Sequence, residues 1–240
     1  MTAGLFTWRA FDDRAAACSA VAEALDDALR AGLDAKGKAS LMLSGGSTPG
    51  PAYTQLSRAA FDWSRVSIGL VDERWVPLSD PRSNELLVRK AMFDGAASAA
   101  TLVSMKTFSE TPFGETQTIA DRYTPLLDID AIVLGMGPDG HTASWFPDCL
   151  GLGRAVDPAN PSPVAPIDAT GAPVAGDTPL RMTLTASAIA TSGMAILLIF
   201  GDEKRDVFER AASHGRDDLS LPVTAAILDL GERLTVFWAP

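Results

Sequence analysis

Short apolar runs alternate with longer amphipathic segments over most of the chain. An apolar run of about four to eight residues, bounded by turn residues, is typical of a buried β-strand. On this basis we predict strands at residues 4–8, 40–43, 66–71, 131–134, 195–200 and 234–238, with a weaker edge strand at 101–105.

Amphipathic segments occupy the spaces between these runs. Residues 13–31 place alanine, valine and leucine on one helical face, and segments 84–93, 114–126 and 202–212 have the same character. Alternating strands and crossover helices are typical of a parallel sheet covered by helices. The pattern therefore predicts a single-domain α/β protein spanning residues 1–240, with a mostly parallel, Rossmann-like sheet and helices on both faces.

Residues 147–179 interrupt this alternation. The segment is rich in proline and has almost no helical periodicity, which predicts a long irregular loop on the surface. Loops of this length in compact domains are usually functional or mobile. Two interpretations stay open, a rim or lid over a site and an excursion without a role.

The composition narrows the range of partners. A formal net charge of −10 at pH 7 repels a polyanion, so we expect no nucleic-acid partner. The longest apolar stretch, residues 194–200, is far shorter than the roughly 18 to 20 residues of a membrane span. We therefore expect a cytoplasmic protein without a membrane partner, either a monomer or a weak homo-oligomer.

The two cysteines, Cys18 and Cys149, stand far apart and lack the CxxC or Cys/His spacing of a metal site. Free cysteines are usually small buried side chains. We predict two buried or half-buried thiols, no disulfide and no metal site.

The first candidate binding motif is LMLSGGSTPG, at residues 41–50. An apolar run leads into Gly45 and Gly46, and Ser47 and Thr48 follow as candidate helix caps. A strand–turn–helix junction leaves backbone N–H groups that can bind an anion, and glycine lets a tetrahedral group approach. The motif predicts a phosphate site, with a plain tight turn as the alternative. It lacks the lysine of a P-loop, so magnesium triphosphate is not indicated.

The second motif is VDERWVPLSDPRSNE, at residues 71–85. Asp72, Glu73 and Arg74 follow a predicted strand, at the end where open α/β sheets place their ligands. We predict that Arg74 reaches a ligand, although three consecutive charges also suit a solvated turn. Asn84 lies near the end of the same motif.

The third motif, IVLGMGPDGHTASWFP, matches the dinucleotide pattern GxGxxG at residues 135–140. A dinucleotide site also needs a long helix on the third glycine and an acidic residue after the next strand. The proline-rich segment follows instead, so we reject that interpretation. The turn is better suited to presenting His141, whose tautomer Asp139 can fix. Residues 142–144 are expected to open a short helix.

Two further basic residues, Arg181 in RMTLT and Lys204 in GDEKRDVF, lie near the start of predicted elements. Each alone is typical of a solvated surface charge. Together with the glycine turn they would form a phosphate clamp, each charged hydrogen bond contributing about 1.5 to 3 kcal/mol. The remaining histidine, His214, suits a helix C-terminus, and we assign it no catalytic role.

In their order along the chain, SGGSTP, VDERWV followed by SN, GMGPDGHTAS-FP, RMTLT and GDEKRDVF resemble the motifs of 6-phosphogluconolactonases over nearly the whole length. That family shares its fold with glucosamine-6-phosphate deaminases. The resemblance implies hydrolysis of 6-phospho-D-glucono-1,5-lactone to 6-phosphogluconate in the oxidative pentose phosphate pathway, without metal or organic cofactor. It implies His141 as general base beside Asp139. The implied substrate- and phosphate-binding residues are Gly45, Gly46, Ser47, Thr48, Asp72, Arg74, Asn84, Arg181 and Lys204.

Several positions bear on the alternatives. Trp145 stands where the lactonases more often have leucine, which predicts an altered pocket wall or a surface that stacks on sugar. Deaminases usually have tyrosine after the Asp-Glu pair and glutamate five residues beyond their histidine, where this chain has Arg74 and Phe146. A non-catalytic sugar-phosphate effector domain, as in some transcription regulators, is a further alternative. It is disfavoured because the chain has no helix-turn-helix segment and keeps the Asp139/His141 pair.

Overall fold

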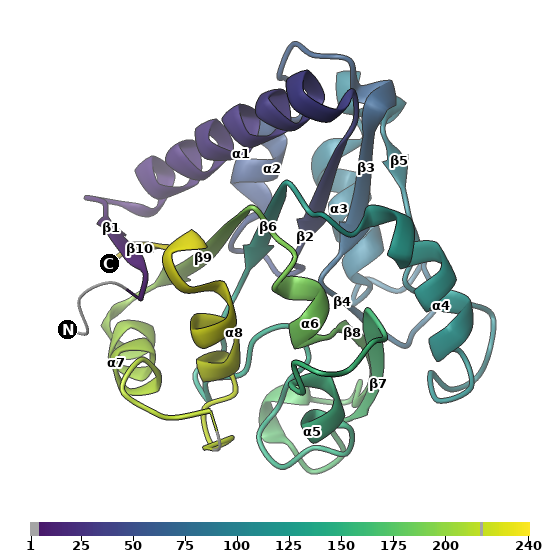
Figure 1. Ribbon diagram of the computed structural model, residues 1–240, viewed down its shortest axis with the longest axis vertical. Helices are drawn as coiled ribbons and strands as arrows, with labels where there is room; N and C mark the ends of the chain where they lie inside the picture. Colours follow the sequence, from purple (N-terminus) through teal and green to yellow (C-terminus); the bar gives the residue numbers. More distant parts are fainter. Residues whose placement is uncertain (1–4, 217) are drawn as a thin grey trace.

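A seven-stranded parallel sheet forms the centre of the protein (Figure 1). The computed structural model describes residues 5–216 and 218–240. The strand order is β1-β10-β9-β6-β2-β3-β5. The strands are β1 Thr7–Ala10, β2 Ala39–Leu43, β3 Val66–Leu70, β5 Thr101–Leu102, β6 Ala131–Leu134, β9 Met194–Phe200 and β10 Leu234–Ala239. The central strands are buried on both faces, which is why their sequences are almost continuously apolar.

Helices cover both faces of this sheet, as predicted. In Figure 1, α1 and α2 lie on one side of the sheet, and α6, α7 and α8 lie on the other. The helix α1 starts after Asp13, whose side chain accepts a hydrogen bond from the Ala16 amide, and it ends at Gly37. The helices are α1 Arg14–Lys36, α2 Gly50–Leu56, α3 Asn84–Met92, α4 Thr116–Tyr123, α5 Leu152–Ala155, α6 Ala186–Ile189, α7 Asp202–Ala211 and α8 Val223–Leu230.

Some predicted boundaries need correction. The first strand begins at Thr7, and the predicted start at Gly4 lies outside the described residues. Only the first two residues of the edge candidate 101–105 form a strand. The expected helix at 114–126 contains α4 and then a 3-10 turn with Pro125, whose ring nitrogen cannot continue the helical hydrogen bonds.

The predicted irregular loop at residues 147–179 needs correction, because the segment is irregular over most of its length but is not without regular structure. The segment contains α5 and the strand β7 (Val164–Asp168), which joins a second, antiparallel sheet of order β4-β8-β7. The other strands are β4, Asp72–Arg74, and β8, Leu180–Leu184. Pro166 is tolerated within β7 because an edge strand leaves part of its N–H row unpaired. Strand β4 lies far from β7 and β8 in sequence, so local periodicity gives no sign that the three form one sheet.

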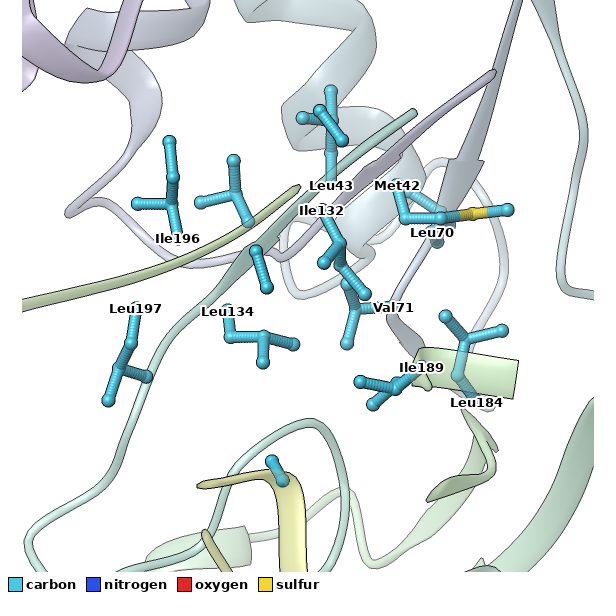
Figure 2. Packing of buried hydrophobic residues seen from close by; sticks show 14 of the residues in the cluster. Met42, Leu43, Leu70, Val71, Ile132, Leu134, Leu184, Ile189, Ile196 and Leu197 are labelled. Carbon is cyan, nitrogen blue, oxygen red and sulfur yellow. The ribbon is translucent and has the colours of Figure 1, made fainter. Parts of the chain in front are cut away.

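One hydrophobic cluster connects the two sheets. Figure 2 shows Leu43, Ile132 and Ile196 from the central strands, with Leu184 of β8 and Ile189 of α6 packed nearby. All five side chains are fully buried. The small sheet is therefore anchored to the large one by shared apolar packing.

Among the described residues, no helix is both long and apolar enough to cross a membrane. The thiols of Cys18 and Cys149 are free, the first buried and the second partly buried. This agrees with the prediction of two unpaired cysteines.

Candidate active site

A cavity of about 270 Å³ opens at the carboxyl ends of β2, β6 and β9. Strands β2 and β6 are neighbours in the large sheet. The next strand of this sheet after β2 is β3, on one side, and the next after β6 is β9, on the other side. Open α/β sheets bind ligands at such a reversal of strand order, because the loops leave in opposite directions and a crevice forms between them. The topology alone therefore marks this position as a binding site.

The cavity collects most of the predicted site residues. Its lining includes Gly45, Gly46, Thr48, Asp72, Arg74, Asn84, His141, Arg181 and Lys204. Ser47 is exposed to solvent and does not line the cavity. Asp139 is also outside the lining, but it contacts the His141 ring.

Asp139 orients the His141 imidazole. The two side chains meet through Nδ1 of His141 and Oδ1 of Asp139, 2.6 Å apart. An ionised carboxylate can only accept, so in the neutral ring Nδ1 carries the proton and Nε2 is the basic nitrogen. Burial by itself would raise the pKa of Asp139, but the hydrogen bond and charge interaction with His141 outweigh it and lower that pKa. The pair therefore combines an oriented imidazole with an ionised partner.

The glycines of the third motif shape a tight turn around this imidazole. The Gly137 amide donates to the His141 carbonyl oxygen at 2.9 Å. A Cβ at Gly137 would overlap the imidazole ring, so a side chain at this position would displace the imidazole. In the GxGxxG pattern, Gly137 makes room for the imidazole and Gly140 adopts a left-handed φ of 74°.

The expectation of a short helix at residues 142–144 is wrong. The Trp145 amide donates to the Thr142 carbonyl oxygen at 2.9 Å, and Ala143 adopts a left-handed φ of 51°. These features make a reverse turn that brings Phe146 back against His141. The two ring centroids are 4.4 Å apart, with 32° between the ring planes.

Trp145 does not form the pocket wall that the sequence predicts. Its side chain is fully buried, and its indole N–H donates to the Leu184 carbonyl oxygen at 2.9 Å. The cavity wall at this point is Phe146. Trp145 thus anchors the reverse turn to β8 from behind.

Asp72 connects three distant segments. Its Oδ2 accepts a hydrogen bond from Ser144 Oγ at 2.6 Å, and Asn84 Nδ2 donates to its Oδ1 at 3.2 Å and to its carbonyl oxygen at 2.8 Å. Nη1 of Arg181 lies 3.9 Å from Oδ2. The Asn84 carboxamide lies so close to Gly45 that a Cβ there would overlap it. Asp72 thereby ties the His141 segment to the start of α3 and to β8.

The neighbouring Glu73 is completely buried and fixes the backbone on both sides of the loop between β4 and α3. Its carboxylate accepts hydrogen bonds of 2.7 to 2.9 Å from the amides of Arg74, Asn84 and Glu85 and from the Ser83 hydroxyl. Burial raises the pKa of Glu73, and these hydrogen bonds oppose the rise. The carboxylate holds Arg74 and Asn84 at the cavity without lining it.

Arg181 presents a buried guanidinium to the cavity. Nε donates to the Thr178 carbonyl oxygen at 2.6 Å, and Nη2 donates to the Ala175 carbonyl oxygen at 3.1 Å. Burial lowers the pKa of Arg181 to about 10, which still leaves the group charged at neutral pH. Its charge lies in a rigid frame on the small sheet.

Two more cations complete the lining. Arg74 Nη1 donates to the Arg82 carbonyl oxygen at 2.6 Å. Burial lowers the pKa of Lys204, opposed by the nearby Glu203. The lining has three basic side chains against one carboxylate, that of Asp72, although the whole chain is acidic. This local excess of positive charge suits an anionic ligand.

The first glycine turn differs from its prediction in one respect. Ser47 and Thr48 do not cap α2, because Pro49 occupies the cap position and makes no side-chain hydrogen bond there. Gly46 has a left-handed φ of 89°, and a Cβ at this position would meet open space. The turn therefore presents backbone to the cavity.

Sequence reasoning missed Ser144 and assigned Phe146 no part in the site. Both depend on the reverse turn, which folds residues after the histidine back toward it. A left-handed alanine gives no signal in sequence, whereas a glycine there would have indicated a turn.

In the described ranges, no group of three or more His, Cys, Asp or Glu side chains could hold a metal ion.

Comparisons with known proteins identify the family. Residues 12–238 match the family described as glucosamine-6-phosphate isomerases/6-phosphogluconolactonase. A 6-phosphogluconolactonase from Rhizobium meliloti is 39% identical over 227 residues, covering 92% of this chain and 95% of that protein. One from Mesorhizobium japonicum is also 39% identical, covering 98% and 96%. The crystal structure of a 6-phosphogluconolactonase from Shewanella baltica superposes with a TM-score of 0.90 at 34% identity, covering 98% of both chains.

Proposed function

Because this chain belongs to the glucosamine-6-phosphate isomerase/6-phosphogluconolactonase family, we propose that it hydrolyses 6-phospho-D-glucono-1,5-lactone to 6-phospho-D-gluconate. This is the second step of the oxidative pentose phosphate pathway. Relatives called 6-phosphogluconolactonases, 39% identical over nearly the whole chain, support the lactone as substrate. The observation that carries the proposal is an Asp139-oriented His141 in a cavity with a cluster of basic side chains.

His141 acts as the general base. Nε2 takes a proton from water while the water oxygen attacks the lactone carbonyl carbon, which gives a tetrahedral oxyanion. Collapse of this intermediate breaks the bond from that carbon to the ring oxygen, and the imidazolium returns its proton to the departing oxygen. The Asp139 carboxylate stabilises the imidazolium between these steps. Acid–base help of this kind typically contributes about 10²- to 10⁴-fold to the rate.

The basic side chains hold the phosphate and orient the lactone. Arg74, Arg181 and Lys204 supply charge from three segments, and a charged hydrogen bond contributes about 1.5 to 3 kcal/mol. Positioning and proton transfer are sufficient for a δ-lactone, which already hydrolyses slowly unaided, so the mechanism uses neither a metal nor an organic cofactor.

Since both sheets line the cavity, we propose that the chain works as one domain.

The isomerase branch of the family is the closest enzymatic alternative. The position after Asp72-Glu73 holds Arg74, and the position five residues beyond His141 holds Phe146. Phe146 is buried against the imidazole, so this position offers no carboxylate for opening an amino-sugar ring. The alternative lacks a group that its chemistry uses.

The decisive experiment uses lactone made freshly with glucose-6-phosphate dehydrogenase, and follows 6-phosphogluconate with its own dehydrogenase. We expect the protein to accelerate lactone loss well beyond the spontaneous rate and to release no ammonia from glucosamine 6-phosphate. Unaltered lactone decay contradicts the proposal. Ammonia release then supports the isomerase branch, whereas sugar-phosphate binding without either reaction supports an effector domain.

A further inference from the structure

We propose that Phe146 is a positioning residue, which holds the base His141 and the anion-binding Arg181 against one aromatic ring. The inference rests on the proposed function and assigns to Phe146 a part in it. Its side chain is 2% exposed and lines the cavity. The ring contacts both the His141 imidazole and the Arg181 guanidinium.

The first contact restrains the imidazole. The rings of His141 and Phe146 lie 4.4 Å apart between centroids. Rotation of an imidazole about its Cβ–Cγ bond is a soft torsion with broad preferences. The hydrogen bond to Asp139 fixes Nδ1, and the ring of Phe146 limits the tilt of the imidazole plane. Together they determine the direction in which Nε2 points.

The second contact restrains the guanidinium. The Arg181 Cζ atom lies 5.5 Å from the centroid of the Phe146 ring. Nε and Nη2 are already engaged by backbone carbonyl oxygens, so the aromatic contact adds a restraint on the guanidinium plane. The negative face of an aromatic ring attracts a cation within about 6 Å, more strongly where water is excluded.

The Phe146 ring contacts two side chains, His141 and Arg181, that come from different sheets. His141 follows a strand of the large sheet, and Arg181 belongs to a strand of the small sheet. A substrate anion held by Arg181 therefore has a fixed position relative to Nε2 of His141. Loss of the ring should affect binding and proton transfer together, whereas loss of Asp139 affects only the base.

The test compares Phe146→Leu with Phe237→Leu in the lactone assay. Phe237 is a matched control, since it is 1% exposed, stacks on Phe11 and has the Arg9 guanidinium over its ring, but does not line the cavity. We expect Phe146→Leu to lower kcat about 10- to 100-fold, because the base is misplaced. We also expect KM to rise about 2- to 30-fold, as lost cation–π contacts predict. Phe146→Tyr, which keeps the ring, should recover most of both losses.

Phe237→Leu should lower Tm comparably and leave kcat and KM near the wild-type values. If Phe146→Leu lowers Tm alone, Phe146 is only a core residue and the inference is wrong. If the leucine variant does not fold, Phe146→Met carries the same test, because methionine fills space without an aromatic face.

A second readout does not depend on activity. The chain has two histidines, so the ring C–H signals of His141 and His214 can be followed separately by NMR. The ring current of Phe146 should displace the His141 signals, and Phe146→Leu should remove that displacement while the His214 signals stay unchanged. Unmoved His141 signals contradict the stacking. An inactive wild type with displaced signals would contradict the proposed function alone.

Discussion

Two glycine turns leave neighbouring strands at the same edge of the large sheet, and they do opposite things. The turn after β2, at residues 44–49, leads into α2 and presents backbone to the cavity. The turn after β6, at residues 135–141, closes on itself through the hydrogen bond from Gly137 to His141 and presents a side chain. One wall is therefore suited to holding an anion and the other to moving a proton.

The difference shows what a glycine pattern can indicate. In both turns a glycine makes room for a functional side chain, and in both a Cβ would overlap it. Gly45 makes room for Asn84, which comes from a different element, whereas Gly137 makes room for His141 of its own turn. Glycine spacing thus predicts a close approach but does not say what approaches.

Among the substitutions that test the two turns, removal of the His141 imidazole should have the largest effect, and the effect should be on kcat. We expect His141→Ala to lower kcat for the lactone about 10²- to 10⁴-fold, because the general base is lost. KM should change little, since the basic side chains are intact. The steady-state assay checks this, with His214→Ala as a control that keeps wild-type rates. A His141→Ala enzyme as fast as wild type would remove His141 from the mechanism.

Removal of the Lys204 ammonium should change KM, the parameter that His141→Ala leaves nearly unchanged. We expect Lys204→Ala to raise KM for the phosphorylated lactone about 10- to 100-fold, the loss of one charged hydrogen bond. Unphosphorylated glucono-1,5-lactone should be hydrolysed by the variant and the wild type at similar rates. Arg205→Ala is the matched control, because Arg205 is the next residue of α7 and pairs with exposed Glu209. Equal KM values for Lys204→Ala and wild type would place the phosphate elsewhere.

Gly45 and Gly137 each make room for a side chain, and alanine at either position tests the role of its own turn. Gly137→Ala displaces the imidazole, so kcat should fall about tenfold or more. Gly45→Ala displaces the Asn84 carboxamide, so KM should rise with a smaller change in kcat. Gly153→Ala, a helical position where a Cβ meets nothing within 4 Å, should leave both unchanged. If both turn variants change the same parameter, the assignment of separate roles is wrong.

The smallest expected effect concerns stability. The folded-state pKa of Asp139 is lowered, so the stability it contributes is present above its unfolded pKa of about 3.9 and is lost as the pH falls through the folded value. Asp139→Asn should therefore have a lower Tm than wild type at neutral pH, and the difference should shrink below about pH 4. Thermal melts from acidic to neutral pH check this. A difference that does not shrink below about pH 4 would contradict the lowered pKa of Asp139.

The sequence predicted the large sheet because each of its central strands carries a local signal. Strands such as β6 and β9 are apolar runs buried on both faces, and their position places the following loops at one edge. The same reasoning placed His141, Lys204 and the glycine turn at a common cavity. These predictions use local signals, namely the apolar runs and the turn residues that follow them.

The parts that the sequence did not predict depend on distant partners. Strand β4 has three residues and is defined by its pairing with β8. Proline in β7 argues locally for a loop, and only the edge position makes it acceptable. The reverse turn depends on a positive φ at Ala143, which alanine rarely adopts. The sequence therefore contains no sign that the chain after His141 folds back against the imidazole.

The pairing of β4 with β8 also has a consequence for how the chain folds. Asp72 lies opposite Thr183, and Arg74 lies opposite Arg181, so the polar wall of the cavity forms only when segments more than a hundred residues apart have met. Contacts of such high sequence separation are costly in chain entropy and slow to form. This wall of the cavity is therefore absent from any partly folded chain in which β4 and β8 have not yet paired.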